Sequence, residues 1–330
     1  MKTLIKLVAF IVILYVIYCM IPFMLIWKDT FLSLTMKGSL KGKIIYSRFG
    51  YEIKSIELPY GKKKEIRSVP PGPYSYPGYI YNPYFSPLGD KIVFSQIDNP
   101  RIELREKLYI MGVDGQDVKC FLEDGNFSVL CPSWSPDGKS IAFLVRDGVR
   151  RGLYITDVNN SNNFKRIIDI QPSPSQPAWS PDSDMIAFSF EDIATRELGR
   201  DIYEDRDMGG IYVVDIQTGQ IRRKIPLAEQ PAWSPNGRKL VYMRNTGYYI
   251  IDIYDFSDSS EYLLVPSKPL YFGDRSPRPV RWSPDGKYIA FWKEIWPGLA
   301  ALYAVEVNNP SRRALITYDS REIIGMSWAK

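Results

Sequence analysis

The sequence predicts an all-β protein: a six-bladed β-propeller of four-stranded antiparallel blades, preceded by one transmembrane α-helix. An aromatic-Ser-Pro motif recurs five times along the 330-residue chain, and partial copies of the same unit stand near both ends. An uncharged run of 21 residues lies close to the N-terminus. We therefore expect a short basic N-terminus at 1–6, a transmembrane helix at 7–27, a juxtamembrane linker at 28–41 and the propeller at 42–330.

The uncharged run begins at Leu7 and ends at Trp27. As a helix that rises 1.5 Å per residue it would span about 31 Å, the thickness of a hydrocarbon core. A cleaved signal peptide is the alternative, but its apolar region would be only about 7–15 residues long and would end in small residues. This run ends in Phe-Met-Leu-Ile-Trp, so we interpret it as an uncleaved signal anchor.

Charge gives a weak cue to the side of the membrane that the propeller occupies. Lys2 and Lys6 precede the run, and the basic residues that soon follow it are Lys28, Lys37, Lys41, Lys43 and Arg48. Taken alone, the positive-inside rule favours a cytoplasmic propeller, but long domains translocate largely regardless of charge. The side of the membrane must therefore be decided on other grounds.

The repeated unit starts with an aromatic residue followed by Ser-Pro. Its anchors are Phe85, Trp134, Trp179, Trp233 and Trp282, at spacings of 49, 45, 54 and 49 residues. Ser-Pro-Asp-Gly favours a tight turn, because proline fixes φ at the second position and glycine accepts positive φ at the fourth. The apolar trio that follows indicates a buried strand. Four antiparallel strands in about 45–50 residues make one propeller blade.

Both ends of the repeat region carry part of a unit. Residues 42–46 match a second strand without its first, and residues 51–69 can supply the outer two strands. Residues 325–328 match a first strand, and Trp328 stands 46 residues beyond Trp282, in phase with the repeat. The two fragments complete a sixth blade, so we expect the terminal strands to pair and close the ring. Closure removes exposed sheet edges.

The pattern Trp-Ser-Pro-Asp-Gly-x-x-Ile-Ala-Phe, complete at 134–143 and 282–291, resembles the WD-repeat-like propeller of the TolB family over residues 40–330. Similar repeats occur in the non-catalytic propellers of prolyl-oligopeptidase relatives and of tricorn protease. The resemblance implies a fold, since these motif residues are structural and the fold hosts many activities. It also implies an extracytoplasmic propeller, because TolB relatives mostly work outside the bacterial cytoplasmic membrane. No catalytic residue carries over, because this sequence shows neither TolB's α/β domain nor a peptidase domain.

Composition excludes several kinds of chemistry. The chain has no histidine, which rules out Ser-His-Asp and Cys-His catalysis and histidine-ligated zinc. Cys120 and Cys131 could pair in an oxidising compartment, although we expect the first on an outer strand and the second near an inner one. The formal charge is only +5 without a dense basic stripe, so no nucleic-acid partner is expected. We also expect no cofactor and no metal.

Irregular segments are predicted on one face of the ring, opposite the Ser-Pro turns; we call these the loop face and the turn face. The segments are 70–84, 191–210, 271–279 and 293–299. Tyrosines in the first suit a glycan or peptide platform, or they pack between two blades. Carboxylates and arginines in the others suit an acidic ligand, a calcium ion or an acid/base pair, or they pair with one another. The candidate ligand or partner residues are Tyr74, Tyr76, Tyr79, Tyr81, Arg196, Arg200, Asp274, Arg275, Arg278 and Trp296.

These features favour a membrane-tethered binding or scaffold module of the cell envelope. It would contact membrane lipid through residues 7–27 and hold a protein, glycan or other envelope polymer on its loop face, without catalysis. A structural part of an envelope complex fits the same features. The alternative is a carbohydrate-active hydrolase or lyase, which needs two carboxyls about 5–9 Å apart. Its candidate residues are Glu197, Asp201, Glu204 and Asp274.

Overall fold

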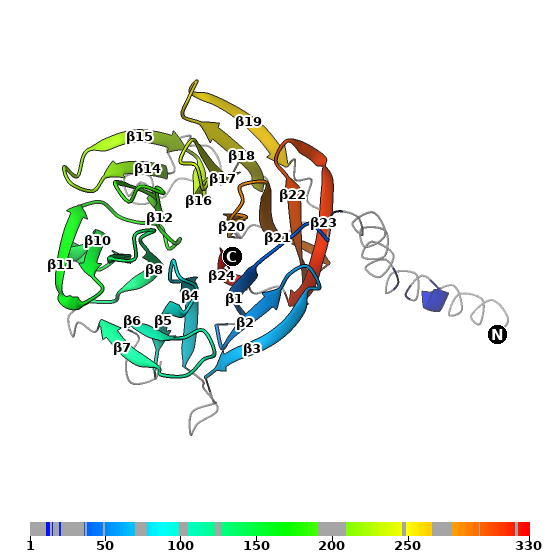
Figure 1. Ribbon diagram of the computed structural model, residues 1–330, viewed down its shortest axis with the longest axis horizontal. Helices are drawn as coiled ribbons and strands as arrows, with labels where there is room; N and C mark the ends of the chain where they lie inside the picture. The colour runs from blue at the N-terminus through cyan, green and yellow to red at the C-terminus, as the bar shows by residue number, and fades with distance from the viewer. Residues whose placement is uncertain are drawn as a thin grey trace.

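The computed structural model describes residues 38–48, 50–69, 78–98, 105–122, 127–190, 209–245, 249–265, 279–296, 298–320 and 323–330, with isolated positions at 11–13, 15, 20 and 36. Within this part of the chain, 24 strands form six four-stranded antiparallel sheets. The sheets are arranged radially around a central axis (Figure 1). The prediction of an all-β six-bladed propeller is confirmed.

We name the sheets blades A to F and give the strands of each from the centre outward. Blade A contains β24 (Ile323–Ala329), β1 (Lys43–Arg48), β2 (Glu52–Glu57) and β3 (Lys62–Ser68). Blade B contains β4 (Tyr79–Phe85), β5 (Lys91–Ile97), β6 (Lys107–Gly112) and β7 (Lys119–Leu122). Blade C contains β8 (Leu130–Trp134), β9 (Ser140–Val145), β10 (Gly152–Asp157) and β11 (Asn160–Ile168), with a 3-10 helix at Gly148–Arg150.

The remaining blades follow the same plan. Blade D contains β12 (Ala178–Trp179), β13 (Met185–Phe190), β14 (Gly210–Asp215) and β15 (Ile221–Pro226). Blade E contains β16 (Ala228–Trp233), β17 (Lys239–Asn245), β18 (Tyr249–Asp255) and β19 (Ser260–Val265). Blade F contains β20 (Val280–Trp282), β21 (Tyr288–Trp296), β22 (Leu299–Glu306) and β23 (Asn309–Ser320).

Pairing of β24 with β1 closes the ring. The two strands are antiparallel, with Ile44 opposite Trp328 and Ile45 opposite Ser327. The Trp328 indole also donates a hydrogen bond of 2.9 Å to the carbonyl of Lys41. The C-terminal strand thus becomes the innermost strand of blade A, and the chain ends at the hub (Figure 1). The predicted closure is confirmed in its register.

The Ser-Pro turns repeat the same backbone hydrogen bond from blade to blade, while the side chain that accepts from the serine hydroxyl varies. In blade C, the amide of Gly138 donates to the carbonyl of Ser135 at 3.0 Å, and the Ser135 hydroxyl donates to Asp137 at 2.6 Å. Gly138 has a φ of +74°, which favours glycine at the fourth position. The equivalent position of blade D is Ser183, at a φ of +61°. The turn geometry therefore survives where the motif loses its glycine.

The anchor tryptophans form the core between blades, as predicted. Trp134, Trp179, Trp233 and Trp282 are all at most 8% exposed. The indole of Trp179 donates to the carbonyl of Ser133 in blade C at 3.2 Å, and that of Trp282 donates to Ala232 in blade E at 3.1 Å. Each of these two side chains thus reaches the inner strand of the preceding blade, which fixes the rotation between neighbouring sheets.

The inner strands bulge three residues before their anchors. Asn82, Cys131 and Gln230 have φ values of +52°, +52° and +58°, and Gly325 has +70°. The β4, β8 and β16 ladders shift register at these points. A bulge bends its strand and redirects the side chains beside it. A proline follows in β4, β8 and β16, where its missing N–H leaves no ladder bond unmade.

We expect Gly325→Ala to destabilise the ring by about 2 kcal/mol or more relative to Gly89→Ala, because overpacking adds to backbone strain. A Cβ on Gly325 would lie within 2.4 Å of the Asn82 Cα. Gly89 has the same positive φ, +72°, but nothing lies within 4 Å of its Cβ position. Urea unfolding of both variants measures the difference. Equal destabilisation would show that close approach at the hub carries no cost.

The predicted transmembrane helix at 7–27 lies almost wholly outside the described residues. Within the residues that are described, no helix has the length and hydropathy that crossing a membrane requires.

Candidate ligand site in the central channel

The residue just before each aromatic anchor stands on an inner strand, close to the central axis. These six residues are Tyr84, Ser133, Ala178, Ala232, Arg281 and Ser327. Four of them are alanine or serine, which leaves open the space that Tyr84 and Arg281 enter. All except Ser133 line a cavity of about 170 Å³.

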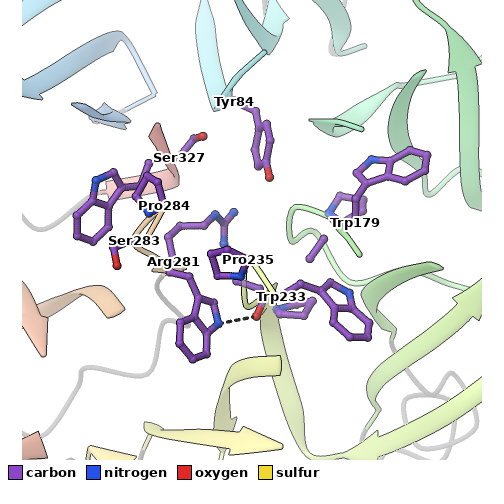
Figure 2. A pocket seen from close by; sticks show the side chains of 14 residues that line it. Tyr84, Trp179, Trp233, Pro235, Arg281, Ser283, Pro284 and Ser327 are labelled. Carbon is purple, nitrogen blue, oxygen red and sulfur yellow. Dashed lines mark hydrogen bonds between the residues drawn. The ribbon is translucent and has the colours of Figure 1, made fainter. Parts of the chain in front are cut away.

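The rest of the cavity wall comes from anchors and prolines of the same repeats. Its other lining residues are Pro177, Trp179, Pro231, Trp233, Pro235, Trp282, Ser283, Pro284 and Trp328. Pro235, Ser283 and Pro284 belong to Ser-Pro turns, so this end of the cavity lies at the turn face (Figure 2). Tryptophan and proline residues supply much of the wall, but polar atoms, including several hydroxyl groups and one guanidinium, make up more of its exposed surface than apolar atoms do.

Arg281 brings that guanidinium into the cavity from blade F. The residue is 7% exposed. Its Nη1 donates to the carbonyl of Val280 at 2.7 Å, and its Nη2 donates to Oε1 of Gln176 at 2.5 Å. Its Nε has no hydrogen-bond partner, and the described residues supply no carboxylate as an ion-pair partner. Burial lowers the pKa of Arg281, and nearby Tyr84 raises it. An arginine nonetheless stays charged in proteins.

Tyr84 enters the cavity from blade B. Figure 2 shows its hydroxyl and the Arg281 guanidinium pointing into the same space. Burial raises the pKa of Tyr84, and the charge of Arg281 opposes that rise. The phenol is therefore a neutral donor at physiological pH. Among the described residues its hydroxyl has no hydrogen-bond partner.

Gln176 connects five blades beside Arg281. It stands three residues before Trp179, and its side chain is 1% exposed. Its Nε2 donates to the carbonyl of Asn82 at 2.9 Å, while its Oε1 accepts the bond from Arg281. Weaker contacts of 3.4 Å join it to the carbonyls of Pro83 and Pro132 and to the amide of Met326. One side chain of blade D thus bonds to blades A, B, C and F.

A second polar cluster joins blades B and C. Glu106, just before β6, is buried enough that its pKa rises to about 7, although a hydrogen bond from Ser95 and the charge of Arg146 oppose the rise. Burial and then Glu106 also raise the pKa of the Cys131 thiol. A buried thiol of raised pKa is a poor nucleophile. Cys131 is a free thiol on the inner strand β8, and the exposed Cys120 lies on the outer strand β7, as expected.

We expect stability to depend on pH through Glu106. Its pKa is raised from 4.5 to about 7 in the folded chain, so stability falls as pH rises across that interval and stays lower above it. The whole effect is at most about 3 kcal/mol. Glu106→Gln should remove this slope, as urea unfolding at pH 5 and pH 8 would measure. The exposed Glu65→Gln is the control; if the two variants keep the same pH dependence, Glu106 is not the titrating group.

Only two of the predicted ligand-face residues have described side chains. Tyr79 stacks on Tyr51 at 5.6 Å and on Tyr81 at 5.8 Å between ring centroids. A Cβ on Gly50 would lie 2.9 Å from the Tyr81 ring, so this side chain packs on the backbone of blade A. The packing interpretation of these two tyrosines is therefore supported, without excluding a ligand on the half-buried rings.

The other predicted residues are not brought together by the described structure. Trp296 ends β21, opposite Leu299 in the ladder. The remainder lie outside the described residues: Tyr74, Tyr76, Arg196, Arg200, Asp274, Arg275 and Arg278. The sequence did, however, contain a signal for the channel residues. Tyrosine and arginine occupy a repeat position that is otherwise alanine or serine.

No family model and no curated protein matches the chain. Solved structures do match. TolB from Acinetobacter baumannii is similar with a TM-score of 0.67 and 18% identity, over 87% of this chain and 66% of that one. A chain of the nidogen/laminin complex is similar with a TM-score of 0.62 and 8% identity, over 87% of this chain and 98% of that one. Oligogalacturonate lyase in complex with manganese is similar with a TM-score of 0.55 and 15% identity, over 81% of this chain and 75% of that one.

The present chain thus spans just under two thirds of the Acinetobacter TolB structure. At these identities the similarity establishes the fold and not the activity. The repeat motif, the six closed blades and these structural neighbours agree: the chain has the six-bladed β-propeller fold seen in TolB.

Proposed function

We propose that this protein is a membrane-anchored binding or scaffold module of the cell envelope, which holds a protein partner on its propeller without catalysing a reaction. The observation that carries the proposal is the closed ring of six blades with TolB among its structural neighbours. A ring that buries its own edge strands presents two stable faces on which loops can bind a partner. The neighbour from a nidogen/laminin complex also supports a protein partner.

The membrane anchor and the location are part of the same proposal. The uncharged run at 7–27 has the length of a membrane span, and its ends lack the small residues of a signal-peptide cleavage site. A signal anchor of this kind would place the propeller on the extracytoplasmic side. Protease protection of spheroplasts with intact membranes tests this step, since an extracytoplasmic propeller should be digested from outside.

The partner is expected on the loop face. Val149 and Leu88 offer a matched pair of positions, because they are aliphatic and 91% and 89% exposed. Val149 lies between the second and third strands of blade C, on the loop face, and Leu88 lies in the Ser-Pro turn of blade B. A photo-crosslinking residue at each position, in the full chain in its native membranes, compares the two faces directly.

We expect a discrete crosslinked protein from position 149 and none from position 88. Replacing residues 191–210 by a short Gly-Ser linker should abolish the crosslink if that segment contributes to binding. Crosslinks from position 88 alone would move the partner to the turn face. No specific crosslink from any exposed position on either face would contradict the binding role.

The alternative function is a carbohydrate-active lyase or hydrolase, and a fold neighbour that is an oligogalacturonate lyase gives it some weight. Its candidate residues Glu197, Asp201, Glu204 and Asp274 all lie outside the described residues. Incubation of the full chain with acidic and neutral oligosaccharides, with and without Mn²⁺, tests this alternative. Product formation that is lost in Asp274→Ala or Glu204→Ala would favour the enzyme over the scaffold.

A further inference from the structure

We propose that the central cavity binds a carboxylate group, held by Arg281 and Tyr84 and entering from the turn face. This inference is independent of the proposed partner on the loop face. It assigns a ligand chemistry to the channel itself, and it rests on the charge, the donors and the shape of the cavity.

The buried positive charge of Arg281 is the first reason to expect an anion. Removing a guanidinium from water costs several kcal/mol unless an anion or a full set of hydrogen bonds compensates it. The partners of Arg281 among the described residues are two neutral oxygens, those of Val280 and Gln176. Its Nε remains without any partner. A buried cation in this state is compensated best by a ligand that brings a negative charge.

The hydroxyl groups of the cavity also favour an anion. Tyr84 has a free hydroxyl that points into the same space as Arg281 (Figure 2). Ser327 accepts a 3.3 Å bond from the amide of Phe85, which leaves its own O–H free to donate. Ser283, by contrast, donates to Asp285 and accepts from the amide of Tyr288, so its hydroxyl is already used. The hydroxyls of Tyr84 and Ser327 can therefore both donate to an anion in the cavity.

The size and the walls narrow the class of anion. A cavity of about 170 Å³ has room for a small organic group, and eight of its 14 lining residues are tryptophan or proline. The single guanidinium balances one negative charge, whereas a phosphate dianion would leave a second charge buried. A carboxylate carries one charge and matches the planar fork of an arginine. Its hydrocarbon part would contact the tryptophan and proline side chains.

The same chemistry has two sources, a free small carboxylate and the C-terminal carboxylate of a partner chain. The experiment uses the full chain in detergent and measures binding by calorimetry and by the shift in Tm. The probes are propionate, its neutral analogue propionamide, a short peptide with a free C-terminus, and the same peptide amidated. We expect propionate and the acid peptide to bind, and the two amides not to bind.

Three variants assign the binding to named groups. Arg281→Gln should abolish carboxylate binding, and Tyr84→Phe should weaken it about tenfold, as loss of one hydrogen bond to a charged group does. Arg238→Gln is the matched control, because Arg238 is an exposed arginine of the Ser-Pro turn of blade E, on the same face. It should leave the affinity unchanged. Tyr84→Phe keeps the test valid if Arg281→Gln does not fold.

The relative affinities of the four probes distinguish the two sources of the carboxylate. Tighter binding of the acid peptide than of propionate by tenfold or more supports a partner's C-terminus, and equal or weaker binding supports a free small carboxylate. Equal binding of acids and amides, or an unchanged affinity in both channel variants, would overturn the proposal. So would a wild-type chain that binds none of the four probes, since Arg281 would then need no external anion. None of these results bears on crosslinking at the loop face.

Discussion

A chain that ends at Ser320 is expected to lose the cooperative unfolding transition of the propeller. The truncation removes β24, the innermost strand of blade A, with the buried side chains of Ile323 and Met326. It exposes one edge of β1 and the inner edge of the core between blades A and F. These losses amount to several kcal/mol, comparable with the whole stability of a typical domain, about 5–15 kcal/mol. Thermal unfolding followed by near-ultraviolet circular dichroism measures the effect.

Adding a synthetic peptide of residues 321–330 to the truncated chain should restore the transition. Its restoring effect should depend on peptide concentration, because anything that binds the folded form stabilises it by mass action. A peptide with Gly325→Ala is the matched control and should restore less, since its Cβ would meet Asn82. If the truncated chain unfolds like the full chain without any peptide, closure by β24 does not hold the ring together.

The ring and its closure were predictable because they depend on the phase of a repeat. Phe85, the four anchor tryptophans and Trp328 mark one position in every blade, and position in the repeat fixes strand order and register. The pairing of Ile44 and Ile45 with Trp328 and Ser327 follows from that phase. The conformation of each Ser-Pro turn depends on neighbouring residues only, so the sequence predicted it as well. Ser183 shows that the turn is fixed by its hydrogen bonds more than by its glycine.

The channel site was missed for a different physical reason. Function usually resides in irregular loops, whereas Arg281 and Tyr84 lie inside the regular repeat. Whether a charged residue at such a position is buried depends on six strands that meet at one axis. Gln176 has five hydrogen-bonding partners from four other blades, and no sequence spacing predicts that convergence. The comparison that would have found the site is between equivalent positions of the repeat.

Gln176→Ala is expected to lower the free energy of unfolding by about 4 kcal/mol, roughly 10 °C in Tm for a domain of this size. The substitution leaves the carbonyl of Asn82 and the Nη2 of Arg281 without their hydrogen bonds in a buried hub. A buried polar group without a hydrogen bond destabilises the fold by its full desolvation free energy, and this penalty is larger for a charged donor than for a neutral one. The loss in unfolding free energy therefore comes mainly from the unpaired Asn82 carbonyl and Arg281 guanidinium, and less from removal of the Gln176 amide itself.

Gln230→Ala is the matched control for this prediction. Gln230 occupies the same position of the repeat, three residues before Trp233, but its described hydrogen bond is made by its backbone amide to Ser189. Its side chain is only partly buried, so truncation should cost less than about 1 kcal/mol. A carboxylate ligand should also rescue Gln176→Ala more than it stabilises wild type, because Arg281 then has a further free donor. Equal losses in the two glutamine variants would mean that Gln176 fills space at the hub without joining its blades.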